Sequence, residues 1–426
     1  MLDIKFILEN KDKVKWASEV KSIPCDVDRI CELYEEIKIL KVKHEEALAL
    51  KNKFSKAIPT ASPEERPEMI AKSKDAGAEA KEHGEKIEAL QPEFNDLMLR
   101  VPQIPLETSP IGGEEANTVI KTIGEPTKFD FDALGHYELL EKNDWAEFTR
   151  LTKITGPRTY ATKGECARLE LAIQTFVIDK LIEKGFNYIT VPALVKPEAI
   201  MDAGHFPGSS TDVMIDDVFQ LEGTGKCLAG TAEIILNSLH KDEILKEDDL
   251  PIMYAGYSPC YRKEAGAAGK DTRGLIRVHQ FHKVEQFIIC KNSAEESAKM
   301  HELLRNTLEE VMQDLELPYQ VLETATGDMG INKIRMQDVE AWMPSEGKYR
   351  ELGSCSTIHD YQARRTNTRY RENGSNEVKF CHTLNNTGIA LPRALAPVLE
   401  NHQTADGKVR IPEKLRPYMG GKEFLG

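Results

Sequence analysis

The residues best suited to chemistry are gathered in one stretch, residues 259–285, which reads PCYRKEAGAAGKDTRGLIRVHQFHKVE. Its strand-like ends enclose a glycine-rich loop whose cations are Arg262, Lys263, Lys270, Arg273 and Arg277. Several cations on one loop can close over a polyphosphate, and a planar guanidinium binds a carboxylate or a phosphate through two hydrogen bonds. The stretch therefore predicts a site for an anionic ligand.

The spacing of these residues gives a second reason to place them together. Alternate residues of a strand face the same side, so Arg262 should share a site with Glu264, and Arg277 should share a face with His279. The sequence of this segment is also compatible with a solvated basic hairpin that has a buried phenylalanine. The residues alone leave both interpretations open.

The usual phosphate loops are absent from the sequence. GTGKC, beginning at Gly223, lacks the spaced glycine and the Ser or Thr of a P-loop, and there is no GxGxxG. A nucleotide would have to be held by side-chain cations and an aromatic platform, for which Phe281 offers a stacking surface and Glu285 an anion. His279 and His282 lie three apart on a strand-like segment and should face opposite sides, so we expect no zinc site.

Composition limits the classes of protein that remain. The chain has 426 residues, 40% of them hydrophobic, which is enough for a large core and more than one domain. The formal net charge of −14 argues against nonspecific coating of nucleic acid such as DNA, so an RNA contact must be local. No apolar run is long enough to span a bilayer, and the eight cysteines show neither a metal spacing nor a disulfide framework. We expect a cytoplasmic protein with no membrane partner.

The elements that must position this site follow from the apolar patterns. After residue 106 we expect an α+β domain, because short β-branched runs such as YITVPALV, DLPIMYAG and VEQFIIC alternate irregularly with helical stretches near residues 169–184 and 293–315. This rhythm favours a mostly antiparallel sheet flanked by helices, spanning residues 106–426.

Residues 1–105 predict a different domain, an antiparallel helical hairpin of the coiled-coil type. Two runs carry apolar residues at heptad spacing: Ile30, Leu33, Ile37, Leu40, Ala47 and Phe54, then Ala76, Ala80, Ile87, Leu90, Phe94 and Leu97. His44 and Lys51 interrupt the first run, the prolines of IPTASPEERP should stop both helices, and Pro92 should kink the second. The hairpin should project into solvent, although an ordinary helical bundle also fits the pattern.

Several long segments resemble one family. YRKEAG with GKDTRGLIRVHQFHKVE resembles motif 2 of seryl-tRNA synthetases, and GIALPRALAPVLENHQ resembles the arginine-bearing motif 3 of the class II fold. GFNYITVPALVKPEAIM is similar to motif 1, which in this family builds the dimer interface. GTAE, RELGSCSTIHDYQARR and IPEKLRPYMGG match as well, so the likeness runs from MLDIKFI to the end of the chain.

The resemblance implies a class II catalytic domain and a serine-tRNA ligase. Such an enzyme uses ATP and Mg²⁺ to activate L-serine to seryl-adenylate, and then charges tRNA(Ser), and tRNA(Sec) where present. It also implies a homodimer through motif 1, with the arm reaching tRNA on the other subunit and gripping its long variable arm. Basic residues of the first helix would touch tRNA or only line a solvated face: Lys38, Lys41, Lys43, Lys51, Lys53 and Lys56.

The resemblance also implies residue roles. Arg262, Glu285 and Arg393 would be catalytic, Arg262 holding first the serine carboxylate and then the α-phosphate. The serine pocket would consist of Thr231, Ala232, Glu233, Arg262, Glu285, Asn385 and Thr387. Its hydrogen-bonding groups would reject alanine, which would leave them unpaired. Without the family match, Glu233 could merely cap a helix.

The ATP site implied by the resemblance places adenine between Phe281 and Arg393, with Glu264 reading the adenine amino group. Its full set is Arg262, Lys263, Glu264, Val278, Phe281, Glu351, Leu352, Gly353, Ser354 and Arg393. Glu351 and Ser354 match magnesium-binding positions and are hard oxygen ligands, although Glu351 alone could be an edge-strand carboxylate.

Some residues depart from the family pattern. LNNTG stands where bacterial members commonly read LNGSG, so Thr387 replaces a serine and Asn386 a glycine whose backbone angle Asn386 should have to adopt. Gly230 stands where a proline often precedes TAE, His282 where an Asp is common, and Pro392 precedes Arg393. We expect these changes to bear on affinity and lineage more than on chemistry.

Two alternatives to the housekeeping ligase stay open. One is a specialised paralogue acting on a carrier protein or on a serine analogue. The full N-terminal arm counts against the carrier-protein role, in which it would have no tRNA to grip. The other is a noncatalytic RNA-binding regulator. Joint retention of Arg262, Glu264, Glu285, Glu351 and Arg393 counts against that one.

Overall fold

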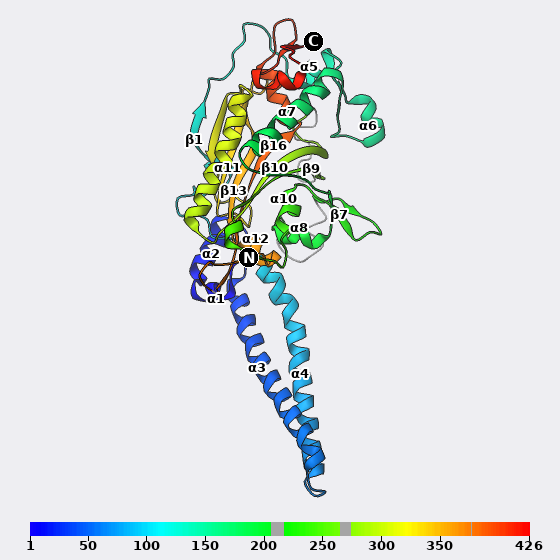
Figure 1. Ribbon diagram of the computed structural model, residues 1–426, viewed down its shortest axis with the longest axis vertical. Coiled ribbons are helices and arrows are strands. Elements are labelled where there is room, and N and C mark those ends of the chain that lie inside the picture. Colours follow the sequence, from blue (N-terminus) through cyan, green and yellow to red (C-terminus); the bar gives the residue numbers. More distant parts are fainter. Residues whose placement is uncertain (206–216, 265–273, 376) are drawn as a thin grey trace. The chain divides into compact units, whose positions relative to one another are not determined.

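The computed structural model describes residues 1–205, 217–264, 274–375 and 377–426 (Figure 1). These residues form two compact units, one of residues 2–102 and one that contains the described residues from 103 onward. The domain limits 1–105 and 106–426 stay a prediction.

The first unit is a helical hairpin with two short helices at its base. Its helices are α1 (Ile4–Glu9), α2 (Lys11–Val20), α3 (Val27–Ala57) and α4 (Arg66–Leu99), and Figure 1 shows α3 and α4 running side by side. The Asp26 carboxylate caps α3 by accepting from the backbone N–H of Arg29. The hairpin expected from the heptads is therefore present. Pro67, however, lies in the first turn of α4 and begins that helix instead of stopping it, as its fixed φ angle favours.

The contact between α3 and α4 follows the expected seam and accommodates the two polar residues that interrupt it, His44 and Lys51. The buried seam residues are Ile30, Leu33, Ile37, Leu40, Ala47, Ala76 and Ala80. Where His44 enters, its Nδ1 lies 2.7 Å from the Ala80 carbonyl oxygen and its ring lies over Gly84. Lys51 likewise passes over Gly77. Glycine leaves room for a long polar side chain that a larger residue would exclude.

The second unit is built on an eight-stranded sheet, in the order β1-β11-β12-β13-β16-β10-β9-β4. Every neighbouring pair is antiparallel except β4 and β9, which confirms the mostly antiparallel sheet. The strands are β1 (Thr118–Ile123), β4 (Asn187–Thr190), β9 (Ile252–Tyr261), β10 (Gln280–Cys290), β11 (Tyr319–Glu323), β12 (Arg335–Met343), β13 (Lys348–His359) and β16 (His382–Leu391).

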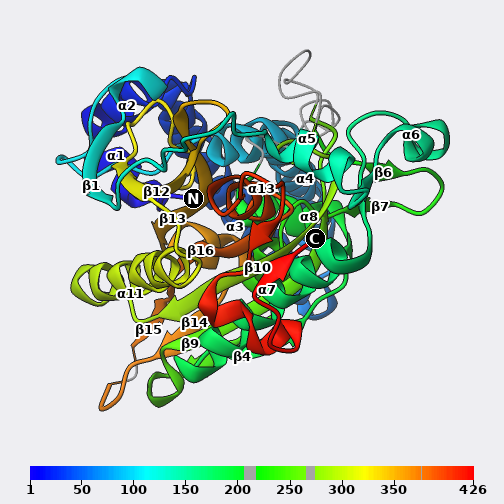
Figure 2. The same ribbon diagram turned by 90° about the horizontal axis from the view of Figure 1, so that it is seen from above.

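Helices cover both faces of this sheet (Figures 1 and 2). On one face, α7 (Gly164–Glu183) and α11 (Ala294–Asp314) pack with Val284 and Ile288 of β10 in the main hydrophobic core. On the other, α10 (Glu233–Ser238) and α12 (Tyr361–Thr366) pack against Phe287 and Ile289. Odd-numbered residues of β10 therefore face α10, and even-numbered ones face α7.

Smaller elements complete the unit. The helices are α5 (His136–Lys142), α6 (Thr149–Thr155), α8 (Pro197–Ala203) and α13 (Leu395–Asn401). The strands are β2 (Ala146–Glu147), β3 (Ala161–Thr162), β5 (Leu194–Val195), β6 (Gln220–Leu221), β7 (Lys226–Leu228), β8 (Ile244–Lys246), β14 (Arg369–Arg371), β15 (Val378–Phe380), β17 (Val409–Arg410) and β18 (Phe424–Leu425). Within the described ranges, no helix has the length and apolar character needed to cross a bilayer.

Two β-bulges decide which side chains reach the α10 face. On β16, Thr387 pairs with Glu285 while Ile389 pairs with Val284, so Gly388 is the extra residue. On β13, Glu351 pairs with Glu340 while Gly353 pairs with Val339, which makes Leu352 extra. An extra residue reverses the alternation of faces beyond it.

Candidate active site

Two cavities on the α10 face of the sheet meet at one residue, Arg262. One of about 260 Å³ is lined by Ile200, His205, Asp217, Val218, Gly230, Thr231, Ile234, Tyr261 and Arg262. The other, of about 240 Å³, is lined by Arg262, Glu264, Leu275, Ile276, Arg277, Val278, Phe281, Lys283, Glu351, Leu352, Thr387, Ala390, Leu391, Pro392 and Arg393. The guanidinium of Arg262 can therefore serve ligands in either cavity.

A buried pair of carboxylates, Glu233 and Glu285, lies next to Thr231 but lines neither cavity, and the two residues are exposed by 2% and 1%. Asn385 bridges them, because its Nδ2 donates to Glu233 Oε2 at 2.8 Å and to Glu285 Oε1 at 3.2 Å. Lys283 pairs with Glu285 at 2.5 Å, and the Thr231 hydroxyl donates to the same carboxylate at 3.4 Å. These acids can accept an ammonium group.

Burial favours a raised pKa for both acids, but because their neighbours differ, the two pKa values shift in opposite directions. Burial works to raise the pKa of Glu233, yet the charge and hydrogen bond of His205, helped by Lys333 and Lys283, outweigh it and lower that pKa to about 2. Burial raises the pKa of Glu285, and the opposing charge of Lys283 does not cancel the effect. Glu233 is thus the firmly ionised member of the pair.

The alternative role of Glu233 as a helix cap does not hold. Its side chain is bound by Gln362 at 2.8 Å, by Asn385 and by His205 at 3.2 Å, within the body of the site. Just before α10, the Thr231 hydroxyl accepts a hydrogen bond from the backbone N–H of Glu233 at 3.3 Å. Thr231 therefore contacts the first residue of the helix and also lines the cavity.

The second cavity is lined by seven of the ten residues expected for the nucleotide, and Lys263, Gly353 and Ser354 do not line it. Arg277 Nη1 lies 2.7 Å from Glu264 Oε2, and the Arg262 guanidinium lies over the Phe281 ring at 5.4 Å from its centre. Arg393 Nη1 contacts the carbonyl and the carboxylate of Glu351 at 3.3 and 3.4 Å. One cavity thus brings together four cations, Arg262, Arg277, Lys283 and Arg393, with an aromatic face.

The period-two argument that predicted part of this arrangement was wrong. Strand β9 ends at Tyr261 and β10 begins at Gln280, so the residues between them follow no strand alternation. Glu264 has a positive φ of 54°, which turns the chain at that point. Arg262 and Glu264 line one cavity because of that turn. Of the expected loop cations, Lys270 and Arg273 lie outside the described residues.

Three expected residues, Ala232, Gly353 and Lys263, line neither cavity. Ala232 is fully buried and packs against Gly256, beneath the site. Gly353 faces α11, because a Cβ there would overlap Leu308. Lys263 borders neither cavity, and its backbone N–H donates to Asp217. Thr387 and Val278 both line the nucleotide-side cavity.

The predicted metal residues share a face only because of the bulge at Leu352. Three residues apart on a regular strand, Glu351 and Ser354 would point in opposite directions. Glu351 instead pairs with Glu340 and Ser354 with Asp338, two positions of β12 that face the same side. Asp338 is 8% exposed, and burial with the charge of Glu351 raises its pKa.

Sequence reasoning missed several residues of this site. No motif or spacing in the sequence distinguishes them from their neighbours. They are Lys283, Gln362, Thr383, His205 and Asp338. Gln362 Oε1 accepts from Thr383 Oγ1 at 2.7 Å, so that its amide is aimed at Glu233. The tertiary fold alone creates this contact.

The expectation for Asn386 was wrong. Asn386 lies within β16, does not adopt a positive φ, and is fully buried on the face opposite Asn385. Its Nδ2 donates to the Leu304 carbonyl of α11 at 2.8 Å. Asparagine at this position therefore ties the sheet to α11 and needs no glycine-like backbone.

The two candidate zinc histidines have separate partners. His279 precedes β10 and its Nδ1 lies 3.0 Å from the Arg262 carbonyl oxygen, whereas His282 Nδ1 lies 2.5 Å from the Tyr257 hydroxyl. Among the residues that the structure describes, no group of three or more His, Cys, Asp or Glu side chains could hold a metal ion together.

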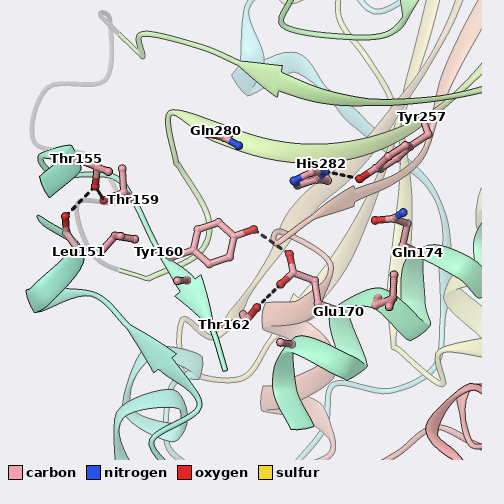
Figure 3. Close-up of a pocket in the computed structure, with 13 residues that line it drawn as sticks. Leu151, Thr155, Thr159, Tyr160, Thr162, Glu170, Gln174, Tyr257, Gln280 and His282 are labelled. Atoms are coloured by element: carbon pink, nitrogen blue, oxygen red, sulfur yellow. Dashed lines mark hydrogen bonds between the residues drawn. The ribbon is translucent and has the colours of Figure 1, made fainter. Parts of the chain in front are cut away.

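A third cavity, of about 530 Å³, opens on the α7 side of the sheet (Figure 3). Figure 3 shows Glu170 of α7 accepting hydrogen bonds from Tyr160 at 2.9 Å and Thr162 at 2.7 Å, with His282 and Tyr257 on the adjoining strands. None of the expected serine or nucleotide residues lines this cavity.

Comparison with known proteins defines first the class and then the family. Residues 218–402 match the tRNA synthetase class II core domain (G, H, P, S and T), so the chain has the core domain of a class II aminoacyl-tRNA synthetase. Residues 1–105 match the seryl-tRNA synthetase N-terminal domain. The chain is 46% identical to the serine–tRNA ligase of Deinococcus radiodurans over 427 residues, covering 100% of this chain and 99% of that protein. The chain belongs to the seryl-tRNA synthetase family.

Solved structures agree with this assignment over the whole chain. The seryl-tRNA synthetase from Pyrococcus horikoshii, solved in complex with ATP, superposes with a TM-score of 0.91 at 36% identity, covering 100% of this chain and 99% of that one. The cytoplasmic serine–tRNA ligase from Naegleria fowleri, in complex with AMP, gives a TM-score of 0.86 at 30% identity, with 100% and 98% covered.

Proposed function

We propose that this chain is a serine–tRNA ligase, which activates L-serine with ATP and transfers the serine to tRNA(Ser), and to tRNA(Sec) where that tRNA is present. The observation that carries the proposal is the position of Arg262 between two cavities. The cavity beside Thr231 and the buried acids suits a small zwitterion, and the cavity with Phe281 and Arg393 suits a nucleotide. One guanidinium can then hold the serine carboxylate against the α-phosphate.

The chemistry needs positioning and charge stabilisation. A carboxylate oxygen of serine forms a bond to the α-phosphorus, while the bond from that phosphorus to the bridging oxygen breaks and pyrophosphate leaves with its electrons. Arg262 offsets the charge that develops at the α-phosphate, and Arg393 steadies the nucleotide. Glu233 and Glu285 receive the serine ammonium. A terminal ribose hydroxyl of the tRNA then attacks the carbonyl carbon, and AMP leaves.

The residues present suit a bound Mg²⁺ ion. Glu351 and Ser354 offer hard oxygen atoms on one face of β13, and Asp338 on β12 adds a buried carboxylate whose Oδ1 has no hydrogen-bond partner among the described residues. Mg²⁺ at this place would neutralise phosphate charge. Glu351 would exchange its contact with Arg393 for that role.

The test of the proposal is serine-dependent exchange of pyrophosphate into ATP, followed by charging of tRNA. Arg262→Ala should abolish exchange, since the variant loses the one cation common to both cavities. Lys246→Ala is the control, because Lys246 is an exposed cation on β8 that borders neither cavity. Folded enzyme that shows no exchange would refute the proposal, and exchange without charging would favour a specialised paralogue, which no comparison supports.

The hairpin is proposed to bind the tRNA. Its α3 carries exposed lysines at positions 38, 41, 43, 51, 53 and 56. Deleting residues 28–100 should spare pyrophosphate exchange and cripple charging, because the hairpin and the catalytic residues belong to different compact units. Equal loss of both activities would contradict this modular picture.

A homodimer through the motif 1 segment is also proposed, in the cytoplasm, with each arm serving the tRNA of the other subunit. Support comes from large apolar side chains exposed along α7, β4 and β5: Leu171 at 58%, Ile182 at 48%, Tyr188 at 38% and Leu194 at 48%. Leu171 also lines the cavity of Figure 3. Leu171→Glu should shift the sedimentation of the protein toward the monomer.

A further inference from the structure

One buried carboxylate outside the cavities connects α5, the turn between β12 and β13, and the helix that follows Arg393. Glu400 on α13 is fully buried and accepts four hydrogen bonds. Two come from His136, from its backbone N–H at 2.9 Å and its Nδ1 at 2.7 Å, and two come from Ser345, from its N–H and its hydroxyl, each at 2.9 Å. Ser345 lies in the turn between β12 and β13, and Arg393 lies seven residues before Glu400.

These contacts fix the tautomer of His136. Burial works to raise the pKa of Glu400, but the hydrogen bonds from His136 and Ser345 outweigh it, and the pKa is lowered. An ionised carboxylate can only accept, so His136 Nδ1 must carry a proton. In the neutral ring, Nε2 is then a hydrogen-bond acceptor.

The Nε2 acceptor is used by the segment that lines the nucleotide-side cavity. The backbone N–H of Leu275 donates to His136 Nε2 at 3.2 Å, and Leu275 itself is fully buried. Gly274, with a φ of 83°, packs so closely on the imidazole that a Cβ there would overlap it. Leu275 to Val278 contribute four consecutive residues to the cavity wall, among them Arg277, which pairs with Glu264.

We propose that His136 is a positioning residue for ATP, which holds the Leu275–Val278 wall of the nucleotide cavity in register with the helix that follows Arg393. His136 touches neither cavity and acts only through Leu275 and Glu400. This inference rests on the proposed use of ATP. Pyrophosphate exchange by the wild-type protein tests that function separately. The role of His136 is tested by comparing how a variant changes KM for ATP and KM for serine.

The test uses the full-length protein and two variants, His136→Asn and His136→Gln, whose amide side chains differ in length. His136→Asn keeps a donor within reach of Glu400 but is too short to accept from Leu275. KM for ATP in pyrophosphate exchange should therefore rise on the order of tenfold, as expected for one lost hydrogen bond. KM for serine should change by less than about twofold, since that pocket keeps its contacts. Hydrogen exchange of the peptide covering residues 274–281 should accelerate.

His136→Gln is the conservative rescue, because its longer amide can donate to Glu400 and accept from Leu275 together. It should restore KM for ATP and the protection of residues 274–281. His402→Asn is the matched control. His402 is buried at the end of α13, the helix that carries Glu400, and its ring Nε2 lies 2.9 Å from the Leu315 carbonyl oxygen, away from the cavity. It should leave both KM values unchanged.

An unchanged KM for ATP in folded His136→Asn would overturn the proposal, as would equal rises in the KM values for ATP and serine. A rise in KM for ATP in His402→Asn as large as that in His136→Asn would also overturn it, because any disturbance of α13 would then suffice. If His136→Asn does not fold, His136→Gln decides. Fast exchange at residues 274–281 with an unchanged KM for ATP in that variant would refute the positioning role.

Discussion

Replacement of Asn385 should weaken the ability of the enzyme to distinguish serine from alanine. The Nδ2 of Asn385 is already committed to Glu233 and Glu285, whereas its Oδ1 is buried and has no hydrogen-bond partner among the described residues. A buried acceptor of this kind is costly unless the ligand satisfies it. We predict that it accepts the hydroxyl proton of the bound serine.

The size of the effect follows from the two hydrogen-bonding roles. Alanine as ligand leaves Oδ1 unpaired, which costs about 1–3 kcal/mol, or roughly 5- to 150-fold in affinity. Asn385→Ala removes that acceptor, so the preference for serine over alanine should fall by a factor in this range. The same variant frees both carboxylates, so both ligands should also lose affinity by a common factor.

Calorimetric titration with the sulfamoyl analogues of seryl- and alanyl-adenylate measures both effects. The ratio of the two Kd values reports the discrimination, and their geometric mean reports the common loss. Asn386→Ala is the control, since Asn386 is the next residue, equally buried, and bonds the Leu304 carbonyl on the opposite face of β16. An unchanged ratio in Asn385→Ala, or an equal change in Asn386→Ala, would refute the reasoning.

Two further predictions concern charge. Burial, with the charge of Arg335, lowers the pKa of His301 to about 3, so between pH 6.5 and about 3 the unfolded chain binds a proton that the folded chain does not. The free energy of unfolding should therefore fall as the pH falls through this range. In His301→Leu, urea titration should show a dependence of that free energy on pH that is smaller by up to about 1.4 kcal/mol per pH unit. Glu351→Gln should raise the Mg²⁺ concentration that gives half-maximal exchange by about tenfold or more, whereas Glu346→Gln, on the turn between β12 and β13, should not; equal requirements in the two variants would remove Glu351 from the metal site.

Local patterns in the sequence were sufficient for the architecture. Heptads in residues 27–97 predicted the hairpin because coiled-coil packing depends on residues three and four apart, which the sequence displays directly. The runs around Ile189, Met253 and Phe287 predicted strands for the same reason, and their irregular spacing indicated an antiparallel sheet. Long motifs then assigned roles to residues, such as Arg262, that neither period nor composition could have placed.

Patterns failed where the chain leaves regular structure. The period of two predicted a shared face for Arg262 and Glu264, but β9 ends at Tyr261, and a turn at Glu264 does the positioning. Gln362 and His136 were missed because each acts through a partner more than 100 residues away, Glu233 and Leu275 respectively. No local signal records a contact of that kind.

The two bulges leave little room for a side chain at Gly353 and Gly388, neither of which lines a cavity. They lie on neighbouring strands, and a Cβ at Gly353 would come within 3.0 Å of Thr387, while one at Gly388 would come within 3.0 Å of the Val284 carbonyl. Either side chain would force the strands apart at the point where the alternation reverses. Because that reversal brings Glu351 to the face of Ser354 and Thr387 to the face of Glu285, regularising either strand would turn one half of the site away from the other.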